Sequence, residues 1–440
     1  MVKNNFLSIF FSELGKNHIK YGVLRNYKAL PDSLGGSDLD ILVGSSDVNA
    51  FYNVLSKVLM SLNGKLIIRY GNVCPRLCVT SFYNGEWFAA QLDVHEGVLP
   101  YNLSSMFSAG FVLDRVYKYN IVSVCNDNDA ALIAFLKEVL HNGKCKEKYY
   151  IGAKHCWDKY SSDYIDMLTE IYGSSFIKVL SSVLSSPFSD SNMGLVSCAG
   201  RQSLASGFYR KIKNIKSKLS RLYRFFSPPG YSVVFLGTDG AGKTTIISAV
   251  SKTLNEAVHN ELHYEHMRPN TIPSIAALFG KRESLTGPNE NPHEYKSSGF
   301  IVSLVRLAYY SIDYIFGYWF KVHPVMVKKS SVWIFDRYYY DYFIDPLRAR
   351  INLPSFVIRF FRFFIPEPDL ILCLGAKPEV IHKRKPELPF EEVIRQVNEL
   401  KFFCENEKRA EWIDTGKDLE ASINQALNTI VSKMAARYIK

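Results

Sequence analysis

A glycine-rich segment with one lysine and two threonines carries the clearest chemistry of this chain. It shows the spacing G-x-x-x-x-G-K-T from Gly237 to Thr244. Glycines at this spacing let the backbone curl so that its N–H groups point at phosphate oxygens, and a helix N-terminus adds a positive dipole. The segment therefore predicts a phosphate-binding loop between a buried strand, which begins at Tyr231, and a helix.

Each polar position of this loop has an expected role with a nucleoside triphosphate. We expect the lysine amine to reach the β- and γ-phosphates and the first threonine hydroxyl to bind Mg²⁺. The loop thus indicates ATP and Mg²⁺ as cofactors. The residues predicted to bind the nucleotide are Gly237, Asp239, Gly240, Gly242, Lys243, Thr244 and Thr245.

A carboxylate and a guanidinium follow an apolar run later in the chain. Residues 332–335 indicate a buried strand, and Asp336 and Arg337 come directly after them. Ligands of open parallel sheets gather at the carboxyl ends of strands. We expect Asp336 to hold Mg²⁺ or to orient the acceptor oxygen, and Arg337 to bind an acceptor phosphate with two hydrogen bonds. The alternative is an ion pair on the surface.

Three cations follow the last strand of this half, which we predict at 369–375. They are Lys383, Arg384 and Lys385, at the end of a short predicted helix. The transition state of phosphoryl transfer spreads negative charge over its equatorial oxygens, which a mobile cation can stabilise. A solvated basic turn is the alternative.

Together these pieces resemble the thymidylate kinase family of P-loop kinases over residues 231–440. The resemblance rests on the loop at 236–245, the D-R-Y triplet at 336–338 and the basic segment around Arg384. It implies a catalytic cation either in the loop or in a lid. Since positions 238–241 carry no cation, it implies the lid, and we choose Arg384 among the three candidates.

The acceptor side departs from the family. The R-E-P-G-G-T segment has no clean counterpart, and the arginine of the A-D-R element is absent at 311–314. The aromatic runs at 309–320 and 338–348 suit sugar rings as well as bases, although core packing also explains such runs. The acceptor-pocket candidates are Arg268, Asp313, Arg348 and Arg350.

Three functions follow as hypotheses. With its N-terminal extension, the chain resembles thymidylate-kinase-like proteins of bacterial surface-polysaccharide gene clusters. That resemblance implies a kinase for a sugar or glycan acceptor in O-antigen or capsule biosynthesis. The rivals are a kinase for the nucleoside monophosphate thymidylate and a nucleotide-binding regulatory or assembly protein with low turnover.

Three carboxylates in the N-terminal half form a second candidate site. Asp38 and Asp40 share one face of the strand predicted at 39–43, and Asp93 ends a later strand. Three carboxylates can hold two Mg²⁺ ions for in-line displacement at a nucleotide α-phosphate. Over residues 20–100 this resembles the polymerase-β type of nucleotidyltransferase, so the chain could be bifunctional. The glycine–serine of that family is replaced by Leu24-Arg25-Asn26, and the alternatives are a fold kept for binding and a loop without a site.

These sites require four segments. We predict a smaller α+β nucleotidyltransferase-like domain at 1–127, a helical extension at 128–200, a basic amphipathic linker helix at 201–230 and a kinase domain at 231–440. The fold class of the last is α/β, with a P-loop parallel sheet flanked by helices. The linker could contact an anionic membrane through 208–226, or it could pack on a neighbouring domain.

The composition sets the remaining expectations. The net charge of +11 favours anionic partners, but no base-reading motif is present, so we expect no nucleic acid. Eight scattered cysteines indicate reduced thiols and a cytoplasmic protein, peripheral on the inner membrane face if the linker binds lipid. The N-terminus lacks a small-residue cleavage site, and the apolar window at 308–320 is too short to span a membrane.

Overall fold

The computed structural model describes residues 6–71, 74–101, 104–204, 222–273, 299–329 and 331–438. The chain divides into two compact units, Met1–Tyr223 and Arg224–Lys440. This division falls within the predicted linker at 201–230. Residues 205–221 lie outside the described residues, so the linker helix and its membrane contact stay predictions.

The second unit is built on a parallel sheet of five strands. Its strand order is β11-β12-β10-β13-β14, and all neighbours pair in parallel. The central strands carry near-continuous apolar runs because helices cover both faces of the sheet. The strands are β10 (Tyr231–Gly237), β11 (Leu262–His266), β12 (Val332–Asp336), β13 (Leu370–Gly375) and β14 (Ala410–Asp414).

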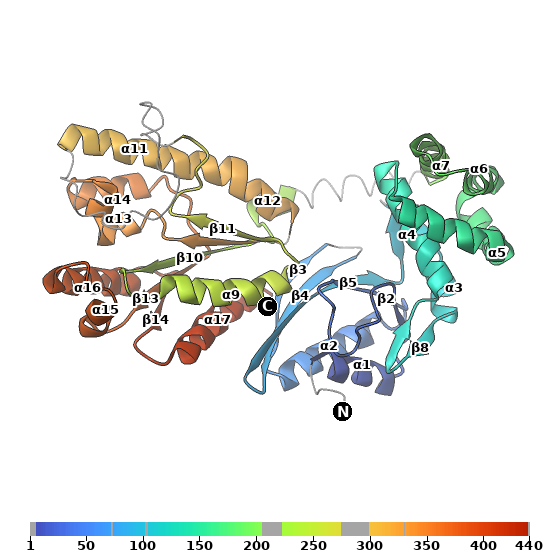
Figure 1. Ribbon diagram of the computed structural model, residues 1–440, viewed down its shortest axis with the longest axis horizontal. Coiled ribbons are helices and arrows are strands. Elements are labelled where there is room, and N and C mark those ends of the chain that lie inside the picture. The colour runs from blue at the N-terminus through green and yellow to red at the C-terminus, as the bar shows by residue number, and fades with distance from the viewer. Residues whose placement is uncertain are drawn as a thin grey trace. The chain divides into compact units, whose positions relative to one another are not determined.

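Helices cover this sheet on both faces (Figure 1). One face holds α9 (Lys243–Ala257) and α17 (Leu419–Ala436). The other carries a core cluster that joins α11, α14 and α16 to the sheet through Leu307, Ile358 and Leu400. The remaining elements of this unit are α11 (Phe300–Gly317), η1 (Tyr318–Val322), α12 (His323–Lys328), α13 (Asp341–Ile344), η2 (Pro346–Ala349), α14 (Ser355–Arg362), α15 (Pro378–Arg384) and α16 (Phe390–Asn406).

The first unit contains a mixed sheet of seven strands in the order β3-β4-β5-β2-β1-β9-β8. In it β2 pairs in parallel with β5 and antiparallel with β1. Its strands, with the separate β6–β7 hairpin, are β1 (Tyr21–Val23), β2 (Leu39–Val43), β3 (Lys65–Tyr70), β4 (Arg76–Tyr83), β5 (Glu86–Glu96), β6 (Leu99–Tyr101), β7 (Ser104–Phe107), β8 (Tyr117–Tyr119) and β9 (Val122–Val124).

Alternation along β2 separates the two cores of this unit. Leu39, Ile41 and Val43 pack with α1 and α2, whereas Leu42 packs in the cluster of the later helices. Since alternate residues share a face, Asp38 and Asp40 lie on the side of Leu42. The helices are α1 (Phe6–Lys16), α2 (Val48–Ser61), α3 (Ala109–Asp114), α4 (Asp127–Asn142), α5 (Glu147–Tyr172), α6 (Ser174–Ser185) and α7 (Asp190–Ser203).

The structure is therefore of the mixed α/β class that the sequence predicts. The second unit has the helix-flanked parallel sheet of a P-loop kinase-like fold, and the mixed sheet of the first unit is compatible with a nucleotidyltransferase-like domain. All eight cysteines are free thiols, as predicted.

One helix is longer than the sequence analysis expected. The apolar window at 308–320 belongs to a continuous helical segment, Phe300–Lys328, of 29 residues. By length and composition it could cross a membrane, so the prediction that it is too short was wrong. Asp313 lies within this helix, where it is fully buried and pairs with Arg268.

Candidate functional site

The glycine-rich loop follows β10, the middle strand of the parallel sheet, and leads into α9. Gly240 and Gly242 have φ angles of +83° and +81°, a region that glycine enters without steric cost. A Cβ atom at Gly240 would lie 2.9 Å from the Ile381 carbonyl oxygen and 3.1 Å from the Lys385 Cβ. The loop can therefore pack against the end of α15 only because this position lacks a side chain.

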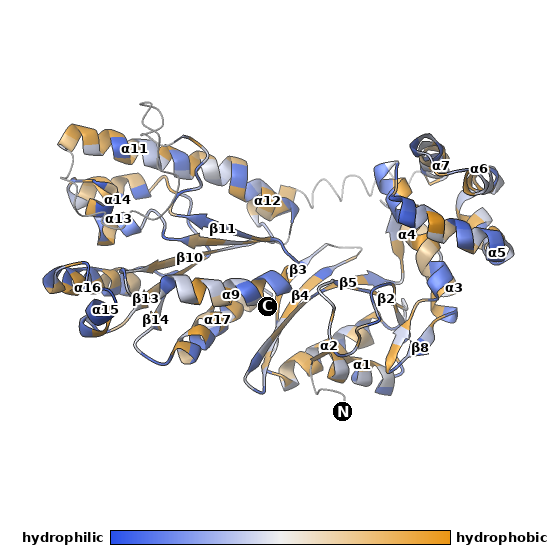
Figure 2. Cartoon of the chain, in the orientation of Figure 1, coloured by the Kyte–Doolittle hydropathy of each residue, from blue (hydrophilic) through white to orange (hydrophobic). Residues whose placement is uncertain are grey.

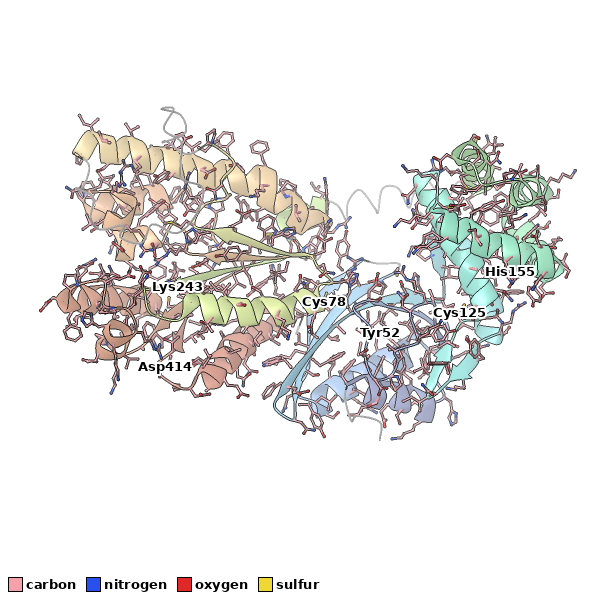
Figure 3. The ribbon with its side chains drawn as sticks, in the orientation of Figure 1. Tyr52, Cys78, Cys125, His155, Lys243 and Asp414 are labelled. Carbon is pink, nitrogen blue, oxygen red and sulfur yellow. The ribbon has the colours of Figure 1, made fainter. Side chains whose placement is uncertain are left out.

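Lys243 begins α9 (Figure 3), and it is almost completely buried. Its amine donates hydrogen bonds to the carbonyl oxygens of Gly237 and Thr238, at 2.8 and 3.0 Å. Burial, assisted by the nearby charge of Arg337, lowers the pKa of Lys243 to about 7. By contrast, Thr244 and Thr245 are exposed at the same helix end, where a ligand can reach them.

Asp239 is the centre of an ion-pair network over the loop. Its carboxylate lies 2.6 Å from the Arg337 guanidinium, pairs closely with Arg348 and lies 3.9 Å from the amines of Lys243 and Lys385. Burial alone would raise the pKa of Asp239, but these four cations outweigh it and lower the pKa below its usual range. The Asp239 carboxylate thus holds four cationic side chains close to the loop.

Asp336 ends β12 beside this network. Tyr264, on the neighbouring strand β11, donates a hydrogen bond of 3.1 Å to Asp336 Oδ2. The other oxygen, Oδ1, is buried and has no hydrogen-bond partner among the described residues. A buried carboxylate oxygen without a partner carries a desolvation cost that a cation would relieve. The carboxylate of Asp336 therefore fits the ligand type that Mg²⁺ prefers.

Arg337 adopts φ = +72° and is buried, so the fold holds it in a strained position. Its backbone N–H donates to the Phe235 carbonyl, and its guanidinium bridges Asp239 and Asp341. We predicted that the Arg337 guanidinium binds an acceptor phosphate with two hydrogen bonds. It already makes hydrogen bonds to two carboxylates. An acceptor phosphate would have to displace one of them.

The three predicted lid cations point in different directions. Arg384 donates a hydrogen bond of 2.9 Å to the Thr415 carbonyl, at the end of β14. Lys385 is the cation that lies near the loop, and it also pairs with Glu387 at 3.0 Å. Lys383 is exposed. Of the three, the one that lies near Asp239 of the loop is therefore Lys385, next to the residue that we chose.

Two of the four acceptor candidates pair with each other. Arg268 and Asp313 bind each other at 3.0 Å, and Asp313, fully buried, also accepts hydrogen bonds from the backbone N–H and hydroxyl of Thr271. Arg348 joins the network of Asp239. The carbonyl of Arg350 accepts a hydrogen bond of 2.9 Å from Arg306. Asp313 is therefore a positioning residue for the segment after β11, whereas Arg268 and Arg348 have guanidinium groups near strand ends.

The tyrosine run after Arg337 belongs to the core. Tyr338 and Tyr339 are buried, and their hydroxyls donate to the carbonyls of Pro366 and Ile358 at 2.9 and 2.7 Å. Both rings contact Tyr314 in T-shaped geometry, with ring centroids 4.8 and 5.9 Å apart. Core packing, one of the two explanations open in the sequence, accounts for them, so they do not offer a stacking surface to a sugar.

In the first unit the three candidate carboxylates meet. Asp40 lies opposite Asp93 in the parallel register of β2 and β5, and one oxygen from each of Asp38, Asp40 and Asp93 lies within 4.8 Å of the others. Arg25 pairs with Asp40 and Asp38, and Arg76 pairs with Asp93 at 3.1 Å. The cluster has the ligand types that Mg²⁺ prefers, but a metal would have to displace Arg25.

A histidine and a cysteine adjoin this cluster. His95 Nε2 lies 3.6 Å from Asp40 Oδ1 and 3.7 Å from the Cys74 sulfur. Burial would raise the pKa of Asp40, but the hydrogen bond from His95 and the charge of Arg25 outweigh it and lower the pKa to about 2. Burial raises the pKa of the Cys74 thiol to about 12, which disfavours a thiolate nucleophile.

Tyr264 and Asp341 were not predicted from the sequence, and Arg384 was chosen there over Lys385, which is the cation that lies near Asp239. Tyr264 lies on β11, which was not predicted because its alternating residues Leu262, Tyr264 and His266 make only a short signal. Asp341 follows Arg337 by four residues, a spacing at which side chains on a helical turn meet, so this pair was visible in the sequence.

No protein-family model matches the chain, and no curated protein matches it. Among solved structures it is similar to the crystal structure of thymidylate kinase from Ehrlichia chaffeensis, with 15% sequence identity and a TM-score of 0.31. That similarity covers 46% of this chain and 97% of the other. The fold class stands on the strand order and parallel register described above.

Proposed function

We propose that the second unit transfers the γ-phosphoryl group of ATP to an acceptor. The observation that supports this most directly is the junction of β10 and α9, where the buried Lys243 amine lies against the loop carbonyls and 3.9 Å from Asp239. In this proposal the loop amides and Lys243 hold the β- and γ-phosphates, and Thr244 and Asp336 hold Mg²⁺, which would neutralise developing charge.

Lys385 serves as the mobile cation in this proposal, in place of Arg384. A triphosphate in the loop would compete for the cations that now surround Asp239, and Lys385 is the most exposed of them. Arg268 and Arg348 stay the proposed acceptor contacts, and Asp313 holds Arg268 in place. Asp336 could also orient the acceptor oxygen.

For the acceptor, we propose a sugar or glycan of bacterial surface-polysaccharide biosynthesis. Arg337 and Arg348 are both engaged by carboxylates, which favours an acceptor that brings no phosphate of its own. Thymidylate is the alternative acceptor, and a nucleotide-binding protein with low turnover is the alternative function.

The test is ADP release by the full chain with ATP, Mg²⁺ and a mixture of nucleotides, sugars and membrane glycolipids, followed by mass spectrometry of the product. Lys243→Ala should abolish turnover, whereas Lys252→Ala, an exposed lysine on the same helix, should keep it. A Lys243→Ala protein with the full rate would refute the role of the loop. Rapid thymidylate phosphorylation would instead refute only the sugar acceptor.

A second candidate function is nucleotidyl transfer by the first unit. The observation that favours it is the meeting of Asp38, Asp40 and Asp93 within 4.8 Å. We expect Mn²⁺ to bind the full chain, Asp40→Asn to weaken this binding, and Asp158→Asn, on the exposed face of α5, to leave it unchanged. Pyrophosphate release from a nucleoside triphosphate mixture would test the activity, and no Mn²⁺ binding would exclude it.

A further inference from the structure

Tyr264 is the residue of β11 whose side chain reaches Asp336. β11 lies at one edge of the parallel sheet and pairs with β12, with His266 opposite Asp336 in register. Residues two positions apart along a strand share a face of the sheet, so Tyr264 and Asp336 lie on the same face. Two residues of a parallel strand span about 6.6 Å, a gap that a tyrosine side chain can bridge.

Packing of the ring does not explain a tyrosine at position 264. Figure 2 shows β11 as a largely hydrophilic strand, and Tyr264 is 50% exposed. The buried Tyr338 and Tyr339 contact another aromatic ring, whereas within the described part of the chain the Tyr264 ring makes no such contact. The part of this side chain with a defined partner is therefore its hydroxyl.

The carboxylate of Asp336 depends on that hydroxyl. The hydrogen bond of 3.1 Å from Tyr264 to Oδ2 is the one hydrogen bond that this carboxylate accepts from the residues that the structure describes, since Oδ1 has no partner among them. Asp336 itself is buried, with 8% of its surface exposed. Without the hydroxyl, both oxygens of a buried carboxylate would lack a donor, which is unfavourable for a charged group.

The cations closest to this strand end are held by other carboxylates. The Arg337 guanidinium binds Asp239 and Asp341, and Arg348 pairs with Asp239 and Asp345. None of the ion pairs among residues 222–273, 299–329 and 331–438 includes Asp336. A buried carboxylate with one free oxygen and no paired cation is suited to bind a cation that comes with a ligand.

We propose that Tyr264 is a positioning residue for Asp336. By holding Oδ2, its hydroxyl fixes the orientation of the carboxylate and leaves Oδ1 as the oxygen that takes the Mg²⁺ of bound ATP. Carboxylates that bind metals are themselves held by hydrogen bonds, and loss of such a partner typically costs about 10–100-fold in metal affinity or activity. This inference rests on the proposed phosphoryl transfer and adds to it a residue that acts through Asp336.

The test is the Kd for ATP, measured by titration calorimetry in Mg²⁺ and again in EDTA. The full chain carries Asp40→Asn, so that the carboxylate cluster of the first unit does not contribute to metal binding. Tyr264→Phe removes the hydroxyl and keeps the ring. We expect it to raise the Kd in Mg²⁺ by about tenfold or more and to leave the Kd in EDTA unchanged.

A matched control is Tyr309→Phe in the same unit. This tyrosine loses a hydrogen bond of 2.6 Å to the Pro273 carbonyl, so both Kd values should stay as they are. Circular dichroism shows that each variant is folded. An equal rise of the Kd in Mg²⁺ and in EDTA would mean that Tyr264 only supports the structure of the site, and it would overturn the proposal, as would no rise at all.

A double substitution tests whether Tyr264 acts through Asp336. Adding Tyr264→Phe to Asp336→Asn should raise the Kd in Mg²⁺ no further than Asp336→Asn alone, because both changes remove the same interaction. Losses that add would overturn the proposal. If Mg²⁺ does not strengthen ATP binding by the chain with Tyr264 intact, the proposed phosphoryl transfer fails together with this role. A normal Mg²⁺ effect that Tyr264→Phe leaves unchanged removes the role of Tyr264 alone.

Discussion

At the scale of single residues, the protonation of Lys243 links nucleotide binding to pH. Burial lowers its pKa to about 7, and a bound triphosphate favours the ammonium form. Below this pKa the lysine is already charged, whereas above it binding must take up a proton. We expect the Kd for ATP to be level below pH 7 and to rise by up to about tenfold per pH unit above it.

Titration calorimetry in two buffers of different ionisation enthalpy measures this proton uptake directly. Above pH 7 the heat should differ between the buffers for the unmodified protein. Lys243→Met should bind more weakly and take up no proton. A Kd that stays level as the pH rises would show that Lys243 keeps an ordinary pKa.

Single substitutions also test whether Lys385 or Arg384 is the cation that stabilises the transition state. Lys385 Nζ lies 3.9 Å from Asp239, whereas Arg384 is bound to the Thr415 carbonyl. Removing one electrostatic contact to a transition state costs about 100-fold in kcat. We expect that loss for Lys385→Ala and less than about tenfold for Arg384→Ala, with ADP release as the measurement. A larger loss in Arg384→Ala than in Lys385→Ala would instead identify Arg384 as the cation that stabilises the transition state.

At the scale of elements, substitutions at two glycines of the loop distinguish the effect of backbone strain from the effect of a steric contact with α15. Both have φ near +80°, so alanine is strained at either position, by about 1 kcal/mol. Only at Gly240 would the new methyl group meet the Ile381 carbonyl oxygen, because nothing lies within 4 Å at Gly242. We expect Gly240→Ala to lower the melting temperature and the ATP affinity more than Gly242→Ala.

Thermal unfolding with and without ATP measures both effects. Equal losses in the two variants would mean that α15 does not press on the loop in solution. A loss of ATP affinity without a loss of stability in Gly240→Ala would instead show that α15 moves away to accommodate the methyl group.

Elements with a strong periodic signal could be predicted from the sequence. The strand predicted at 39–43 lies where its apolar spacing placed it, and Asp40 therefore meets Asp93. β1 ends at Val23, and three residues later Asn26 takes a positive φ. Local spacing does not encode such backbone turns.

The ion-pair network could not be predicted, because it depends on long-range placement. Asp239 and Arg348 are more than one hundred residues apart in the chain, and they meet because the loops after β10 and β12 lie at one edge of the sheet. Similarly, Arg384 and Lys385 are adjacent in sequence, and only the last turn of α15 decides which one faces the loop.

At the scale of the whole molecule, the two units should respond to different ligands. Each has its own sheet and its own core clusters, so each can unfold as a cooperative body. A ligand that binds only one folded unit stabilises that unit, by about 2.7 kcal/mol at one hundred times its Kd. We expect calorimetry of the full chain to show two transitions, of which ATP mainly raises that of the second unit and Mn²⁺ without nucleotide mainly raises that of the first.

Two substitutions assign these transitions without cutting the chain. Lys243→Ala should remove the shift with ATP, and Asp40→Asn should remove the shift with Mn²⁺, because each changes one site only. A shift of both transitions by either ligand would mean that the two sites are coupled through contacts between the units. A single transition would mean that the units unfold together, and the chain would then act as one folding body despite its two sheets.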